Sequence, residues 1–338
     1  MGKCGWKESG AIMFRPLVRG CALVAIPSLF LAQDPVIRVN VNLVHVIASV
    51  RNQSGELVGA LTQSDFEIFD NGVRQDIAVF AKQSDQPLSV ALLIDTSGST
   101  SKDLKFETAS AARFLHVLLT EGRPDDSVAL YSFNYDITEL QPFTHNHRAL
   151  ETSLNSLLKH LKGEAGTSLY DAIYYAARAL ENREGRKVIV VITDGGETTS
   201  SRDLKQALEA VQLADAVIYP LVVIPVTNDA GRNIGGEHAL AILAERTGGR
   251  TFLPAGSAEL DRAFSDLLNE LRTQYVLGFY PHGVPLTKER FHSLQVRVKS
   301  PELRVSARNG YYGEAEGDSA PASPRLPEAP GKKQNHEE

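Results

Sequence analysis

Two patterns of apolar and polar residues divide the chain. Between residues 36 and 82, apolar side chains largely alternate with polar ones, which is typical of half-buried β-strands. The pair Asn71-Gly72 lies between two such runs and predicts a hairpin, because a type I′ turn needs positive φ at both central positions. From Pro87 onward, near-continuous apolar runs alternate with helical patterns. The pattern therefore predicts a small antiparallel β module followed by an α/β domain.

The second part has the strand–helix order of a doubly wound fold. Leu88–Asp95 and Lys187–Asp194 are apolar along almost their whole length, as strands buried on both faces of a parallel sheet are. Further strands are expected at 127–133, 137–143, 216–224, 250–253 and 274–280, and helices at 102–119, 147–160, 168–182, 202–214, 236–247 and 257–272. This order predicts a mostly parallel α/β sheet, which binds ligands at the carboxyl ends of its strands.

The amino-terminal segment differs in composition from the rest. Both cysteines, both methionines and the single tryptophan lie in the first 21 residues, at Cys4, Cys21, Met1, Met13 and Trp6. Four basic residues come before the uncharged apolar stretch Cys21–Ala32, which has the length of a signal-peptide core and is too short for a membrane span. We expect a secretory signal that starts at Met1 or Met13 and is cleaved near Ala32; a short uncleaved anchor is the alternative. The expected location is secreted, periplasmic or at the cell surface.

The remaining segments complete the expected organisation. Residues 291–299 and 303–312 look like strands, which either complete the β module or add a hairpin to the α/β domain. The last residues are rich in proline and poor in apolar side chains, which predicts disorder. The expected order is a signal peptide at 1–32, the β module at 33–84, the α/β domain at 87–280, a β segment at 281–313 and a disordered tail at 314–338.

Composition excludes several classes of function. The 338 residues are 43% hydrophobic and 22% charged, as in soluble globular proteins. Without residues 1–32, which hold four basic and one acidic side chain, 31 basic residues face 40 acidic ones and the net charge is −9. Nucleic acid is therefore a poor candidate partner. The absence of cysteine after Cys21 excludes a disulfide framework, a cysteine zinc site and a thiolate nucleophile in the body of the chain.

Oxygen-bearing side chains gather at the predicted strand ends. Asp95, Ser97 and Ser99 follow the first strand of the α/β part, and Asp194 ends another. Thr167 lies in a loop flanked by glycine just before a predicted helix. Hydroxyl and carboxylate oxygens suit a hard cation such as Mg²⁺, which prefers octahedral oxygen coordination and keeps several waters. These five residues are the candidate metal ligands.

The motif resembles the metal-ion-dependent adhesion site of the von Willebrand factor type A family. The resemblance rests on Asp-x-Ser-x-Ser at residues 95–99, on Thr167 and on Thr193-Asp194-Gly195, and it covers about residues 87–275. It implies that two serines and a threonine hold Mg²⁺, or a similar ion such as Mn²⁺ or Ca²⁺. The aspartates then assist directly or through water, and an acidic residue of a protein ligand fills an open position on the ion.

The flanking segments carry a finer resemblance. Leu61–Gly72 before the α/β domain, and Gln274–Tyr280 with Ala307–Tyr311 after it, are similar to a bacterial subgroup of secreted von Willebrand type A proteins common in acidobacteria. The resemblance to this subgroup implies an architecture and no defined ligand.

Other interpretations use the same residues. Serine near a strand end is also an ordinary helix cap, and Ser99 or Ser101 could cap the following helix. An aspartic protease is disfavoured because Asp95-Thr-Ser lacks the glycine of that motif. A zinc site at His145-x-His147 lacks a third ligand. A metal hydrolase needs a positioned general base, which the sequence does not supply. We therefore expect a non-enzymatic protein that mediates divalent-cation-dependent protein binding or adhesion. The alternative is a scaffold or accessory subunit of an envelope complex, in which the ion is structural.

Overall fold

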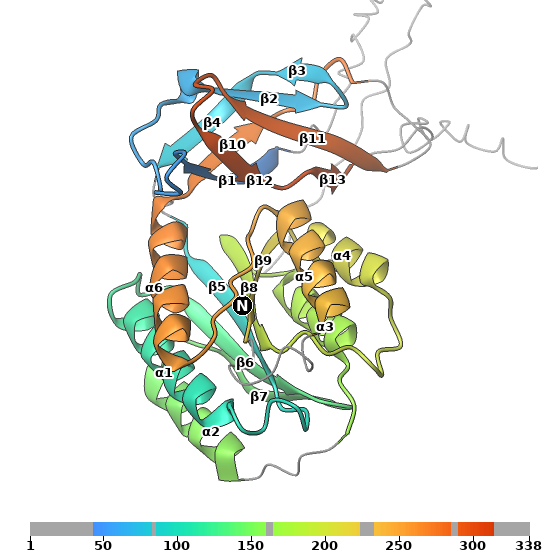
Figure 1. Cartoon of the computed structure of the whole chain (residues 1–338). Coiled ribbons are helices and arrows are strands. Elements are labelled where there is room, and N and C mark those ends of the chain that lie inside the picture. The colour runs from blue at the N-terminus through green and yellow to red at the C-terminus, as the bar shows by residue number, and fades with distance from the viewer. Residues whose placement is uncertain (1–42, 83–85, 160–164, 224–232, 285–289, 314–338) are drawn as a thin grey trace, which may run out of the picture. The chain divides into compact units, whose positions relative to one another are not determined.

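The structure is a computed structural model that describes residues 43–82, 86–159, 165–223, 233–284 and 290–313 (Figure 1). The expected signal peptide and carboxy-terminal tail lie outside the described residues. Within these ranges, no helix has the length and apolar character needed to cross a membrane.

A five-stranded sheet forms the centre of the α/β domain. Its strand order is β7-β6-β5-β8-β9, and all neighbouring strands are parallel except β6 and β7. The strands are β5 (Leu88–Asp95), β6 (Ser127–Phe133), β7 (Ile137–Thr144), β8 (Arg186–Thr193) and β9 (Ala216–Val222). The central strand β5 is buried along its whole length. This sheet confirms the predicted fold class.

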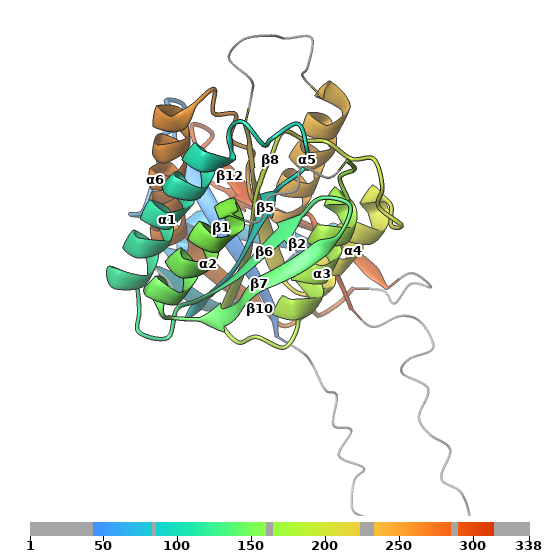
Figure 2. The same ribbon diagram turned by 90° about the horizontal axis from the view of Figure 1, so that it is seen from below.

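Helices cover both faces of this sheet (Figure 2). The helices are α1 (Leu104–Thr120), α2 (His147–Lys159), α3 (Leu169–Leu180), α4 (Leu204–Leu213), α5 (Ile234–Thr247) and α6 (Ser257–Thr273). Alternate residues of β5 supply the two cores: Leu92 packs with α1, α2 and α6, whereas Leu93 packs with α3, α4 and α5. This two-sided burial explains why β5 and β8 are apolar without alternation.

Two antiparallel sheets of four strands each form a β sandwich. Their strand orders are β12-β1-β10-β4 and β13-β11-β2-β3. The strands are β1 (Val44–Arg51), β2 (Phe66–Asp70), β3 (Val73–Gln75), β4 (Ile77–Lys82), β10 (Tyr275–Phe279), β11 (Phe291–Val298), β12 (Arg304–Ala307) and β13 (Gly310–Tyr312). Val46, Ile68, Leu277 and Leu294 share one buried core. Segments before and after the α/β domain thus pair in the same sheets.

The hairpin predicted at Asn71-Gly72 is confirmed. Strands β2 and β3 pair in antiparallel register on either side of it. Asn71 has φ of 46° and Gly72 has φ of 81°, so both central residues take the left-handed conformation that the type I′ turn requires.

Two predicted strands differ from expectation. The segment 274–280 was expected within the α/β domain, but β10 pairs with β1 and β4 in the sandwich. That placement buries Tyr275, Leu277 and Phe279 in the sandwich core. The segment 250–253 is shorter than expected and forms only an isolated parallel bridge to β9, between Phe252 and Leu221. The placement of 274–280 was missed because an apolar run shows that a strand is buried without showing which strands lie beside it.

A buried carboxylate links the sandwich to the α/β domain. Glu270, on α6, is 1% exposed and accepts hydrogen bonds from Arg51 of β1 at 2.5 Å and from Nε of Arg250 at 2.8 Å. A carboxylate with so little access to water needs such partners to remain charged. Helix α6 is thereby fixed to the first strand of the sandwich.

Candidate functional site

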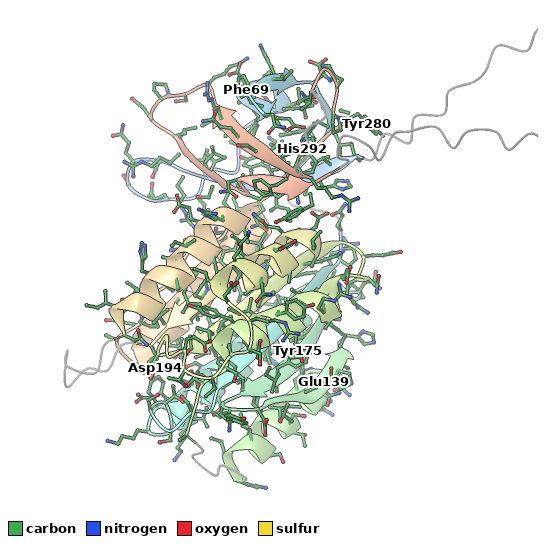
Figure 3. The ribbon with its side chains drawn as sticks, turned by 90° about the vertical axis from the view of Figure 1, so that its right-hand side faces the viewer. Phe69, Glu139, Tyr175, Asp194, Tyr280 and His292 are labelled. Carbon is green, nitrogen blue, oxygen red and sulfur yellow. The ribbon has the colours of Figure 1, made fainter. Side chains whose placement is uncertain are left out.

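The sheet brings the two candidate aspartates to the same edge. Strands β5 and β8 are parallel neighbours, with Ile94 opposite Ile192, so their carboxyl ends lie side by side. Asp95 is the last residue of β5, and Asp194 starts the loop after β8, where Figure 3 labels it. The charge of Asp194 acts on the Asp95 carboxylate and helps to raise its pKa, after the larger effect of burial.

The loop after β5 is organised around the Asp95 carboxylate. Asp95 is fully buried; its Oδ1 accepts a hydrogen bond from the Ser97 amide at 2.9 Å, and its Oδ2 accepts one from the Thr193 hydroxyl at 2.6 Å. The hydroxyl oxygens of Ser97 and Ser99 are 3.1 Å apart. Three candidate ligands of this loop therefore lie together, with Asp95 in a fixed orientation.

The second and third loops hold Thr167 beside Asp194. The Thr167 amide donates to the Thr198 hydroxyl at 2.8 Å, and the Thr198 amide donates to the Thr167 carbonyl at 2.9 Å. Gly196 lies between the two candidate ligands: a Cβ at this position would be 3.1 Å from Oδ1 of Asp194 and 3.4 Å from Oγ1 of Thr167. The five predicted residues are thus gathered from three loops at one edge of the sheet.

The serines of the loop do not cap α1. The residue before this helix is Asp103, and no side chain accepts a capping hydrogen bond there. Ser101 donates instead to the carbonyl of Gly98 at 2.9 Å, and Thr100 donates to the carbonyls of Asp95 and Ser97 at 3.0 and 3.1 Å. Helix capping therefore does not account for Ser99, an exposed residue whose hydroxyl lies beside that of Ser97.

Glu197, which follows Asp194 closely, has a structural role. Its Oε1 accepts hydrogen bonds from the amides of Thr199 and Ser200 at 3.1 and 2.9 Å. Its Oε2 accepts from the amide of Tyr170 and the hydroxyl of Ser200 at 2.9 and 2.7 Å. With both oxygens engaged, Glu197 fastens its loop to the start of α3.

One residue of this region was missed by sequence reasoning. Glu107, in the first turn of α1, is 0% exposed, and neither of its carboxylate oxygens has a hydrogen-bond partner among the described residues. Burial, followed by the charges of Asp95, Asp103 and Asp194, raises its pKa well above the usual range. A signal was present, since Glu107 lies at helical spacing between the buried residues Leu104 and Ala111.

The chemistry of the donor set fits a hard divalent cation. Among the described residues, no cluster of three or more His, Cys, Asp or Glu side chains is placed to hold a metal ion. The candidate site instead combines two aspartates with three hydroxyls, a set suited to Mg²⁺ with several retained waters. Glu107, a buried carboxyl without a hydrogen-bond partner among the described residues, is subject to the charges of both aspartates, and a cation at the site would offset that repulsion.

The Asp95 carboxylate gives the metal-free protein a predicted pH dependence. Burial raises its pKa from 3.8 to about 6, and the charge of Asp194 adds to this, while hydrogen bonds from Thr193 and Ser97 act in the opposite direction. Between these values the folded state binds a proton that the unfolded state releases, so stability decreases as the pH rises. Asp95→Asn should remove this contribution.

The effect is measured by thermal unfolding of the wild type and of Asp95→Asn in chelator, at a series of pH values from about 4.5 to about 7.5. We expect the variant to gain stability relative to the wild type toward the upper limit. If the difference in stability between the two proteins does not change with pH, the pH dependence does not come from Asp95.

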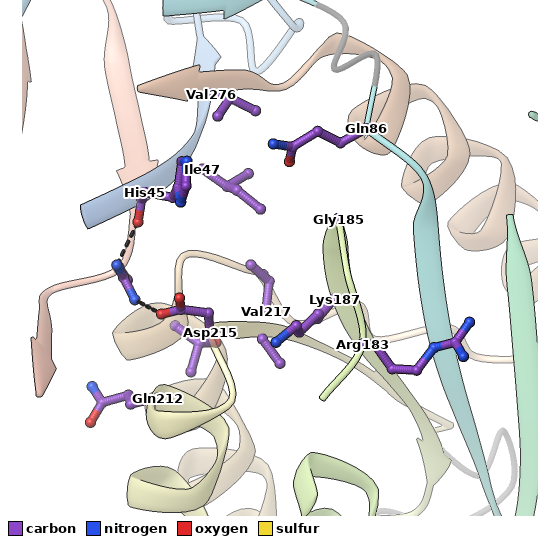
Figure 4. Close-up of a pocket in the computed structure, with 13 residues that line it drawn as sticks. His45, Ile47, Gln86, Arg183, Gly185, Lys187, Gln212, Asp215, Val217 and Val276 are labelled. Atoms are coloured by element: carbon purple, nitrogen blue, oxygen red, sulfur yellow. Dashed lines mark hydrogen bonds and ion pairs between the residues drawn. The ribbon is translucent and has the colours of Figure 1, made fainter. Parts of the chain in front are cut away.

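A pocket at the opposite end of β8 offers different chemistry (Figure 4). Its volume is about 220 Å³, and Lys187, Asp215 and Arg308 are among the residues that line it. The Lys187 ammonium donates to the carbonyl of Glu181 at 2.8 Å, and Arg308 pairs with Asp215 and donates to the carbonyl of His45 at 2.5 Å. These cations already have partners within the protein, so the pocket is secondary to the cluster after β5 and β8.

The comparison with family models agrees with the motif. Residues 90–197 match the family model of the von Willebrand factor type A domain. No curated protein matches the chain. The solved structures similar to it include the conserved hypothetical protein BatB from Bacteroides thetaiotaomicron, with 21% identity, coverage of 54% of this chain and 98% of that one, and a TM-score of 0.44.

Two further structures come from pili. The vWF domain of the type V pili tip protein Mfa5 from Porphyromonas gingivalis has 16% identity, coverage of 54% of this chain and 94% of that one, and a TM-score of 0.43. The PilB minor pilin from Streptococcus sanguinis has 14% identity, coverage of 56% and 62%, and a TM-score of 0.43. From the family match, the chain contains a domain of the von Willebrand factor type A family, as the motif at Asp95, Ser97 and Ser99 predicts.

Proposed function

We propose that this chain is a secreted or envelope-associated protein that binds another protein through a divalent cation, held by Asp95, Ser97, Ser99, Thr167 and Asp194. The observation that carries the proposal is the convergence of these oxygen donors from three loops at the carboxyl edge of β5 and β8. The secreted location rests on the amino-terminal pattern of the sequence.

The charge of the donor set favours an acidic protein ligand. Two aspartates and three neutral hydroxyls leave a divalent cation without surplus negative charge around it. Such an ion remains able to bind one more carboxylate in exchange for a water. An aspartate or glutamate side chain of a partner protein supplies that group.

Exposed aromatic and aliphatic side chains near the candidate site favour a protein over a small ligand. Tyr135 is 59% exposed, and its carbonyl accepts a hydrogen bond from Ser168, next to Thr167. Ile234 is 72% exposed in the first turn of α5, the turn whose Gly236 contacts Gly195. Exposed aromatic and aliphatic residues around a polar centre are characteristic of protein interfaces. We therefore propose a ligand that presents apolar side chains beside its carboxylate.

Two serines of the same loop provide a matched test of the cation site. Ser99→Ala removes a proposed ligand, whereas Ser101→Ala removes a hydroxyl that only bonds the carbonyl of Gly98. In calorimetric Mg²⁺ titrations we expect Ser99→Ala to weaken binding by at least about tenfold and Ser101→Ala to leave it unchanged. Equal Mg²⁺ affinity in the two variants counts against Ser99 as a ligand, and absence of Mg²⁺ binding by the wild type contradicts the site.

Ligand binding is tested separately. The wild type, immobilised in Mg²⁺, should retain a protein from an envelope or matrix extract and release it when a chelator is added. The Ser99→Ala column should retain less of the same protein, whereas the Ser101→Ala column should match the wild type. Retention that is equal in Mg²⁺ and in chelator contradicts cation-dependent binding and favours a scaffold in which the ion is structural.

A further inference from the structure

Glu107 is a buried carboxyl group in an environment that offers no compensation for a negative charge. It is 0% exposed, and neither carboxylate oxygen has a hydrogen-bond partner among the described residues. Removing a carboxylate from water without hydrogen bonds or a counter-charge is among the most unfavourable arrangements in a protein interior. A hydrophobic residue of similar size would pack in α1 at no such cost, so the position calls for a physical explanation.

The charges that act on Glu107 add to the cost of a negative charge there. The strongest electrostatic effects on its carboxylate come from Asp95, Asp103 and Asp194, which are all acidic. Two of these are proposed cation ligands, so Glu107 lies in the field of the site that they form. The first turn of α1, where the helix dipole favours negative charge, offsets only a fraction of such repulsion.

We propose that Glu107 is a sixth residue of the cation site, a buried carboxylate behind the Asp95 loop whose negative charge strengthens the binding of the divalent ion. The inference rests on the proposed function, because it uses the same ion. A divalent cation near Asp95 and Asp194 is the counter-charge that the protein lacks, and the attraction between unit charges is large where water is excluded. The five loop residues define the position of the ion, and Glu107, on α1, increases the affinity of the site for it.

Two variants, one in the first turn of α1 and one just after its last residue, separate this role from a structural one. Glu107→Gln keeps the size of the side chain and removes its charge. Glu121→Gln removes the same charge at the other end of the helix, where the side chain is 60% exposed and faces Arg272. In calorimetric Mg²⁺ titrations of the full chain, we expect Glu107→Gln to weaken binding by at least about tenfold and Glu121→Gln to match the wild type.

Unfolding in chelator supplies the second readout. Since Glu107 has no partner to lose, the melting temperature of Glu107→Gln without metal should equal or exceed that of the wild type, and its increase on adding Mg²⁺ should be smaller. If Glu107→Gln does not fold, Glu107→Asp replaces it; this variant keeps the charge and should bind Mg²⁺ more tightly than Glu107→Ala.

Each outcome is decisive. Wild-type Mg²⁺ affinity in Glu107→Gln, together with loss of binding in Ser99→Ala, overturns the role of Glu107 and leaves the proposed function standing. No Mg²⁺ binding by the wild type overturns both. If the replacement pair is used, equal affinities in Glu107→Asp and Glu107→Ala also overturn the inference.

Discussion

Asp194→Ala is expected to abolish measurable Mg²⁺ binding and to leave the metal-free protein folded. Asp194 supplies one of the two aspartates in the proposed ligand set, so its loss removes a formal negative charge beside the ion. The structural cost is small, because this half-buried carboxylate lies on a loop and accepts a hydrogen bond from the amide of Gly196 at 2.9 Å. Calorimetric titration measures the binding, and thermal unfolding in chelator measures the fold.

Asp95→Ala is the informative comparison. It should abolish Mg²⁺ binding as well, but it leaves the Thr193 hydroxyl and the Ser97 amide without their buried acceptor. Each unsatisfied group costs about 1–3 kcal/mol, so this variant should also lose stability in chelator. Mg²⁺ binding by Asp194→Ala with the affinity of the wild type would show that the ion does not depend on this aspartate.

Glu270→Ala is expected to lower the free energy of unfolding by about 2–4 kcal/mol. The substitution removes the common acceptor of Arg51 and Arg250 and leaves two guanidinium groups without their buried counter-charge. Arg51 is 20% exposed and Arg250 is 34% exposed, so partial hydration keeps the cost below that of a fully buried pair. Denaturant unfolding monitored by circular dichroism measures the change.

Asp266→Ala provides the control on the same helix. Asp266 lies 4.0 Å from Arg250, and its side chain is 61% exposed. An ion pair this exposed contributes about 0–1 kcal/mol, so the variant should unfold almost as the wild type does. Similar losses of unfolding free energy in Glu270→Ala and Asp266→Ala would show that burial does not determine the strength of the ion pairs made by Glu270.

The residues of the candidate site could be selected from the sequence because two strong rules coincide. Apolar runs fix where the strands end, and parallel strands place their carboxyl ends at one edge of a sheet. Asp95 and Asp194 follow from these rules alone. Thr167 was selected by its glycine-flanked loop and by the family motif, since its position beside Asp194 depends on hydrogen bonds between two loops.

Other features of the fold depend on contacts between residues far apart in the sequence, which a local pattern does not show. The run at 274–280 is apolar whether it pairs in a parallel or an antiparallel sheet, and only its partners β1 and β4 decide. Glu107 was overlooked for a related reason. A helical pattern shows which face is buried, but it does not show that the charges acting on the buried carboxyl group are those of Asp95 and Asp194 rather than those of cations.

The pairing of β10 with β4 implies an order of folding during synthesis. Lys82 lies opposite Tyr275, so the two ends of the α/β domain meet within one sheet, and Ala48 of β1 pairs with both Tyr275 and Ala307. Strands β1 and β4 therefore emerge long before their partners β10 and β12, whereas the parallel sheet can close without them. Once that sheet has formed, it holds the distant strands close and reduces the entropy lost in joining them. A nascent chain that stops before β10 presents unpaired edges, which are sites of aggregation.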